Sequence, residues 1–206
     1  MTNSNSYLKN IFINCPFDDE YKSLLNCLLF TVIYCGFEPK IASSRTDSGE
    51  VRFNKIKYLI KDSFFSIHDL SRMGPIEEGE LPRFNMPFEL GVDFGCREYG
   101  TEEQSNKKFL VLDKEQYRYK QALSDLSGHD FKSHKSDPET LIRKVRNWIW
   151  ESVEEPIPSA NTIWQDYNEF YDDFLTATRE QGYSEADIQD MPVAEMIDFM
   201  KEWKSS

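Results

Sequence analysis

Apolar residues along the first 150 positions fall into two patterns that alternate. Short apolar runs at 10–14, 63–68 and 108–112 are typical of buried strands, and weaker runs at 39–42 and 130–132 predict two more. Between these runs the apolar positions recur every 3.6 residues. This spacing predicts helices ending before Gly36, over 50–62, from Asn85 onward and over 140–153. Asn85 is expected to cap the helix that follows it. Strands that alternate with helices in this way form a parallel sheet with helices on both faces.

The predicted fold class is therefore α/β: a flavodoxin-like three-layer sandwich with about five mostly parallel strands, followed by a C-terminal helical appendage. Two helical stripes, over 161–178 and 193–203, predict the appendage, and Ser184 with Asp187 resembles a capping box between them. Pro156 and Pro158 interrupt helix formation just before the appendage. We therefore expect an α/β domain over 1–155 and a helical appendage over 156–206.

The distribution of charge supports the same division. The 206 residues include 36 acidic and 24 basic side chains, a net charge of −12, and residues 151–206 hold 14 of the acids but only 3 of the bases. An acidic chain lacks the basic face that duplex nucleic acid requires, so we expect no duplex partner. We expect the acidic appendage to support a homo-oligomer or to contact a protein partner.

Simple patterns argue against several other classes of protein. Residues 1–10 are polar and unlike a secretory leader, and the most apolar run, 27–35, is too short to cross a membrane. We therefore expect a cytoplasmic protein without a membrane partner. The four cysteines form no Cys-x-x-Cys pair and the three histidines are scattered, so we expect neither a metal site nor a disulfide framework. The absence of a Gly-rich phosphate loop gives kinase or NTPase chemistry little support.

Three polar clusters lie where the predicted strands end or where the next helix begins. They are residues 14–18 (Asn-Cys-Pro-Phe-Asp), 66–72 (Ser-Ile-His-Asp-Leu-Ser-Arg) and 83–91 (Arg-Phe-Asn-Met-Pro-Phe-Glu-Leu-Gly). Because the carboxyl ends of parallel strands meet at one edge of a sheet, we expect the clusters to converge there. Ligands of doubly wound folds bind at that edge.

The clusters resemble motifs of the superfamily that joins nucleoside 2-deoxyribosyltransferases to TIR-like domains, over roughly residues 8–150. Cys15-Pro16-Phe17 is similar to the Gly-Pro-Phe opening of the transferases, although Cys15 stands where they have Gly. Asp69 matches the acidic position of their nucleoside pocket. Residues 88–91 (Phe-Glu-Leu-Gly) resemble their helix motif, whose Glu is the nucleophile, whereas residues 85–87 (Asn-Met-Pro) replace a Gly-Thr stretch. A glutamate on the corresponding helix is catalytic in TIR domains that cleave NAD.

The resemblance implies a nucleotide N-glycosidase that hydrolyses NAD or a related nucleotide and requires no cofactor. By analogy with small versions of this fold, it also implies an effector role in bacterial antiphage defence. Cleavage of an N-glycosidic bond passes through an oxocarbenium-like state, which a carboxylate stabilises or attacks. We expect Glu89 to be this carboxylate, with a pKa raised by burial, and Asp69 to be a second catalytic acid.

The remaining candidates would bind the substrate. Asn14 or Asn85 could hydrogen-bond the sugar or amide, Phe17 or Phe88 could stack on the base, and Arg45 or Arg72 could meet a phosphate. The full set of predicted substrate-binding residues is Asn14, Cys15, Pro16, Phe17, Arg45, His68, Arg72, Asn85 and Phe88.

Structural roles are an alternative explanation for several of these residues. Glu89 could serve the helix dipole, Asp69 could cap a turn, His68 could pack against a loop, and Cys15 could be an inert buried thiol. Two alternative functions stay open as well. One is a nucleotide-binding or self-assembly module without turnover, and the other is a true nucleoside deoxyribosyltransferase.

Overall fold

A computed structural model describes residues 4–44, 49–74, 84–126, 128–153 and 155–206. It contains a five-stranded parallel sheet in the order β2-β1-β3-β4-β5, which is the flavodoxin-like order predicted from the sequence. The strands are β1 (Asn10–Asn14), β2 (Glu38–Ile41), β3 (Phe65–Asp69), β4 (Lys108–Asp113) and β5 (Lys132–Ser133). All residues of β1 and β3 are buried, because helices cover both faces of the sheet at its centre.

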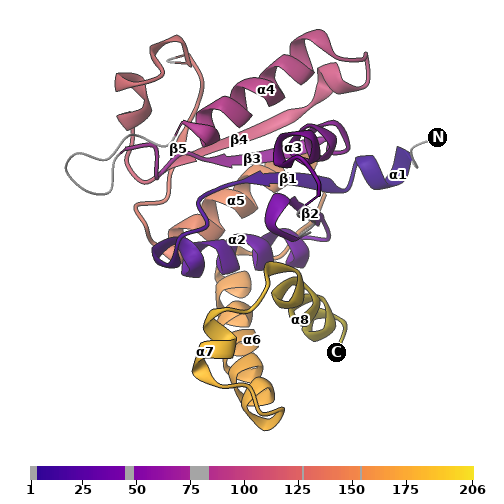
Figure 1. The fold of residues 1–206 in the computed structure, drawn as a ribbon, viewed down its shortest axis with the longest axis vertical. Helices are drawn as coiled ribbons and strands as arrows, with labels where there is room; N and C mark the ends of the chain where they lie inside the picture. Colours follow the sequence, from indigo (N-terminus) through magenta and orange to yellow (C-terminus); the bar gives the residue numbers. More distant parts are fainter. Residues whose placement is uncertain (1–3, 45–48, 75–83, 127, 154) are drawn as a thin grey trace.

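Helices form the layers above and below the sheet (Figure 1). On one face lie α3 (Arg52–Lys61) and α4 (Asn85–Tyr99), which contact each other. On the other face lie α2 (Lys22–Tyr34) and α5 (Pro138–Val153). A short N-terminal helix, α1 (Ser4–Tyr7), precedes β1. Side chains of α4 and α3 therefore meet one set of alternating strand residues, and side chains of α2 and α5 meet the other set.

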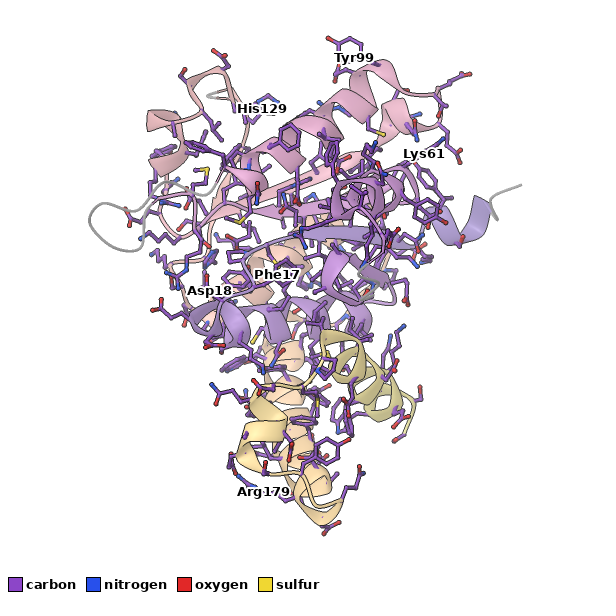
Figure 2. The ribbon with its side chains drawn as sticks, in the orientation of Figure 1. Phe17, Asp18, Lys61, Tyr99, His129 and Arg179 are labelled. Atoms are coloured by element: carbon purple, nitrogen blue, oxygen red, sulfur yellow. The ribbon has the colours of Figure 1, made fainter. Side chains whose placement is uncertain are left out.

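The C-terminal helices pack against α2 and α5 and extend from them on the side away from the sheet (Figure 1). They are α6 (Ala160–Glu180), α7 (Glu185–Gln189) and α8 (Val193–Ser205). One hydrophobic cluster includes residues of the sheet, α2 and α5 together with Ile163, Phe170 and Met200 of the C-terminal helices. The α4 end that carries Tyr99 and the α6 end that carries Arg179 lie at opposite ends of the long axis (Figure 2).

Helix α2 shows the main difference from the predicted pattern. The sequence predicts one apolar stripe, yet every residue from Leu24 to Ile33 is buried. The sheet covers one side of α2, and α5, α6 and α8 cover the others. The ring of Phe30 lies 5.4 Å from the ring of Tyr167, 5.3 Å from that of Phe170 and 5.8 Å from that of Trp203, between centroids. The C-terminal helices therefore complete the hydrophobic core around α2.

Most predicted elements are confirmed within a few residues. Strand β1 has its predicted bounds, and the capping box of Ser184 and Asp187 is present at the start of α7. The prediction that Asn85 caps the following helix is wrong. Asn85 is the first residue of α4, and Phe84, which has no capping side-chain hydrogen bond, precedes it.

Among the described residues, no helix is both long and apolar enough to span a membrane.

Candidate functional site

The predicted clusters converge on the carboxyl edge of the sheet. The last residue of β1, Asn14, pairs in register with His68 of β3, and Asp69 ends β3 one residue later. The sheet order reverses between β1 and β3, because the chain proceeds from β1 outward to β2 and then returns to β3 on the other side. Doubly wound proteins bind their ligands beyond the strand ends at such a point.

Strand alternation divides the candidates between the two faces of the sheet. Asn14 and His68 point toward α4, since Asn14 donates to the backbone oxygen of Met86 over 2.9 Å and His68 contacts Asp93. The side chain of Asp69 points toward the opposite face, where it contacts Tyr21 at the start of α2. The two predicted catalytic acids, Glu89 on α4 and Asp69 on β3, therefore belong to different layers.

Glu89 lies on the buried stripe of α4, which consists of Met86, Glu89, Leu90 and Asp93. It is 7% exposed, and Oε1 lies 3.9 Å from a guanidinium nitrogen of Arg52, at the start of α3. Burial raises the pKa of Glu89, although the positive charge of Arg52 acts in the opposite direction. The predicted upward shift is confirmed. A carboxyl group in this setting is costly to keep ionised, which is typical of functional sites.

A buried polar network fixes α4 against the sheet one turn beyond Glu89. The Asn14 amide donates to Met86 and also lies 3.1 Å from Nδ1 of His68, so Nδ1 is an acceptor and Nε2 is the donor. Nε2 of His68 lies 3.1 Å from Oδ2 of Asp93, and Nζ of Lys107 lies 3.3 Å from Oδ1. The side chains of His68, Asp93 and Lys107 are all 0% exposed.

This network gives structural roles to His68 and Asp93. His68 joins β1, β3 and α4 from inside the core and has no access to solvent. Asp93 contacts Lys107, whose ammonium also donates 2.8 Å to the backbone oxygen of Ile60. Burial alone would raise the pKa of Asp93, but the contacts with His68 and Lys107 outweigh it and hold the pKa below its ordinary value.

Asp69 belongs to a second buried network on the other face. Its Oδ2 accepts from the Tyr21 hydroxyl over 2.6 Å and lies 3.1 Å from Nε2 of His134, while its Oδ1 accepts from the Ser71 amide over 2.8 Å. Burial would raise the pKa of Asp69, but these three contacts lower it overall. Asp69, which is 0% exposed, therefore holds together the ends of β3, β5 and the segment before α2.

Cys15 belongs to the hydrophobic cluster on the face covered by α2 and α5, and it is unsuited to nucleophilic attack. It is 2% exposed, and burial raises the pKa of its thiol well above the ordinary value. The negative charges of Asp69 and Glu89 raise this pKa further, so Cys15 is close to both acids. A neutral, buried thiol is a poor nucleophile.

The remaining candidates differ in accessibility. Pro16 is buried, whereas Phe17, which lies with Asp18 where β1 leads toward α2, is 43% exposed (Figure 2). Phe88 is 58% exposed, and its ring lies 5.3 Å from that of Phe53 on α3. Asn85 is exposed beside them at the start of α4. Phe88 and Phe53 are the chain neighbours of Glu89 and Arg52, and their exposed rings are suited to stacking on a base.

The structure describes one of the two arginines that were predicted to bind a phosphate. Arg72 is half-buried and forms ion pairs with Asp18, at 3.1 Å, and with Glu20. A phosphate at this position would therefore compete with two carboxylates. Arg45 lies outside the described residues.

Several residues of the site were missed by sequence reasoning: Tyr21, Arg52, Lys107 and His134. Their partners are distant in the sequence, and no local motif marks them. Within the described part of the chain, no group of three or more His, Cys, Asp or Glu side chains is arranged to hold a metal ion.

Comparisons of the chain with protein-family models, with curated proteins and with solved structures give no match.

Proposed function

We propose that the protein is a nucleotide N-glycosidase in which Glu89 is the catalytic carboxylate. The observation that carries the proposal is the place of Glu89. It lies on the core-facing stripe of the helix that follows β3, beside the strand ends where doubly wound folds bind ligands, and burial raises its pKa. A carboxylate in a partly dry site stabilises an adjacent oxocarbenium-like centre more strongly than one in water.

The neighbours of Glu89 fit a nucleotide substrate. Phe88 and Phe53 offer exposed aromatic surface for a base, and Asn85 offers an exposed amide for sugar hydroxyls. Arg52 keeps a positive charge within 4 Å of Glu89, which favours its ionised form. Asp69 would have only a structural role, because its oxygen atoms already accept from or contact groups of the protein on the opposite face of the sheet.

Product analysis by chromatography tests this proposal. The protein is incubated with NAD and, separately, with deoxynucleosides, and released nicotinamide or free base is measured. We expect the wild type to release nicotinamide and Glu89→Gln to lose at least about 100-fold in rate. Glu98→Gln is the matched control, because Glu98 is an exposed residue of the same helix. Equal hydrolysis by the wild type and Glu89→Gln would refute the role of Glu89.

A nucleotide-binding module without turnover is the second candidate. It is favoured by the engagement of Asp69 in an internal network, which leaves Glu89 without the second acid that was expected. This alternative predicts that NAD binds to the wild type without release of nicotinamide. Base exchange between deoxynucleosides would instead indicate the deoxyribosyltransferase.

The acidic C-terminal helices are proposed to contact a partner through their outer face. Glu169 and Asp172 are exposed on α6, whose apolar residues pack inward, whereas Asp166 and Asp173 of the same helix accept hydrogen bonds from Tyr34 and Trp203. Sedimentation of the full chain tests self-association. Replacement of Glu169 and Asp172, both exposed, by Lys should abolish an oligomer held together by this face.

A further inference from the structure

A pocket of about 320 Å³ opens at the carboxyl edge of the sheet, on the face away from Glu89. Residues that follow three different strands line it: Ser71 after β3, Lys114 after β4 and Ser136 after β5. Ser23 of α2 completes one wall. The position is again the strand-end edge where doubly wound folds bind ligands, but the side chains are hydroxyls and cations rather than the aromatic rings near Glu89.

The Ser71 hydroxyl is a buried polar group without a partner. Ser71 is 6% exposed, and its Oγ has no hydrogen-bond partner among the described residues. Buried hydroxyls are normally satisfied, because an unmade hydrogen bond costs free energy. Ser71 also lines the pocket, so a ligand there could satisfy its hydroxyl group.

Two cations line the same pocket. Arg72 keeps donors beyond those used by Asp18 and Glu20, because a guanidinium group has five N–H donors. Lys114 is half-exposed, and its ammonium lies 3.8 Å from Glu115. Glu20 is the acid in the lining, and it is paired with Arg72. The lining therefore holds two cations and one acid, and because Asp18 and Glu20 already bind Arg72, a phosphate would use the remaining Arg72 donors together with Lys114.

The wall after β5 is held in an unusual conformation. Lys135 and Ser136 both have φ of 56°, a left-handed conformation that non-glycine residues seldom adopt. The amide of Lys135 donates 3.1 Å to the backbone oxygen of Lys114, and the amide of Ser136 donates 3.0 Å to Nδ1 of His134. Because His134 also contacts Asp69, the buried network beneath the pocket fixes the position of Ser136. Strained backbone that is held in place in this way is common at functional sites.

We infer that this pocket is an anion site that binds a phosphate group, with Ser71, Lys114, Arg72 and Ser136 as its donors. The site is separate from Glu89 and does not depend on the proposed glycosidase activity. Phosphate fits the lining because it accepts several hydrogen bonds at once and pairs with both Lys and Arg. The buried network of Tyr21, Asp69 and His134 preorganises the site and does not touch the ligand.

The test is a titration of the full-length protein with inorganic phosphate, followed by NMR of the backbone amides, with sodium chloride of matched ionic strength as the reference. We expect saturable shifts at Ser71 and Ser136. Lys114→Ala should weaken phosphate binding by about tenfold, which corresponds to the loss of one charge-assisted hydrogen bond. Ser71→Ala should weaken it by roughly threefold to tenfold, as expected for a neutral hydrogen bond.

Lys120→Ala is the matched control, because it removes the same charge from an exposed residue of the same β4–β5 segment. It should leave the affinity unchanged within about twofold, as expected for a distant charge that salt screens. Ser136→Gly is a second variant that removes a hydroxyl while tolerating the left-handed backbone, so it should weaken binding even if Ser71→Ala fails to fold. The site is refuted if millimolar phosphate gives no saturable shift, or if Lys114→Ala and Lys120→Ala weaken binding equally.

Discussion

Replacement of Asp93 by Asn tests the buried network that fixes the helix of Glu89. Asp93 is 0% exposed and lies between His68, at 3.1 Å, and Lys107, at 3.3 Å. The substitution keeps the shape of the side chain but removes its charge, which leaves the buried ammonium of Lys107 without its counter-charge. Removal of one partner from a buried ion pair costs about 3–5 kcal/mol.

The expected loss is large enough to measure by thermal and urea unfolding. For a chain of this size, each kcal/mol corresponds to roughly 2–4 °C in Tm, so Asp93→Asn should lower Tm by roughly 10 °C at pH 7. Asp198→Asn, which removes an exposed acid from α8, is the control and should change the free energy of unfolding by less than about 0.5 kcal/mol.

The pH dependence gives a second, independent readout. The pKa of Asp93 is lower in the folded protein than in the unfolded chain. Its contribution to the free energy of unfolding is therefore fully present at pH values above the unfolded pKa of about 3.9. The contribution disappears as the pH falls through the lower folded value. The difference between the wild type and Asp93→Asn should therefore be constant above about pH 4 and shrink only as the pH falls further. A loss below about 1 kcal/mol at pH 7 would refute the reasoning, since a buried pair must cost more than a surface pair.

Four further predictions concern the core around α2, the carboxyl group of Glu89 and the buried cysteines. Phe30→Ala should cost about 3–5 kcal/mol in a urea melt and keep a single transition, because Phe30 joins α2 to α6 and α8; two transitions would contradict the shared core. Glu89→Gln should be more stable than the wild type at pH 7 but not below about pH 4, because burial raises the pKa of Glu89 and the ionised form is therefore the costly one; a variant less stable at pH 7 would contradict this. Arg52→Gln should move the acidic limb of any pH–rate profile upward, since Arg52 lowers the pKa of Glu89; an unmoved limb would exclude this coupling. Cys15 and Cys27 should react with a thiol reagent only after unfolding, because both are buried and burial raises both pKa values; rapid labelling of the native protein would contradict the structure.

Local patterns predicted the sheet well, because the strands are defined by short apolar runs. Strand β1 has its predicted bounds, and the clusters after β1 and β3 meet as expected, with Asn14 opposite His68. Glu89 was placed on a helix by its motif, and its buried position and the direction of its pKa shift agree with the prediction.

The rest depends on contacts that no local pattern contains. Asp69 and Glu89 were predicted to share one site, but the alternation of side chains along β3 sends Asp69 to the face of α2. The contacts from Asp69 to Tyr21 and His134 each join positions far apart in the sequence. Asn85 was predicted as a cap from its residue type, yet α4 begins with Asn85 and lacks a side-chain cap at Phe84.

Helix α2 is enclosed by the sheet and by α5, α6 and α8, and this enclosure shields its backbone amides from solvent. Amide hydrogens exchange with solvent only when local or global unfolding exposes them. Solvent can reach the α2 amides from Leu24 to Ile33 only after α6 and α8 separate from it or the sheet itself opens. These amides should therefore be among the last to exchange deuterium. The slowest hydrogen exchange in the α/β layer would then depend on the separation of the acidic C-terminal helices from α2, although these helices lie outside the sheet.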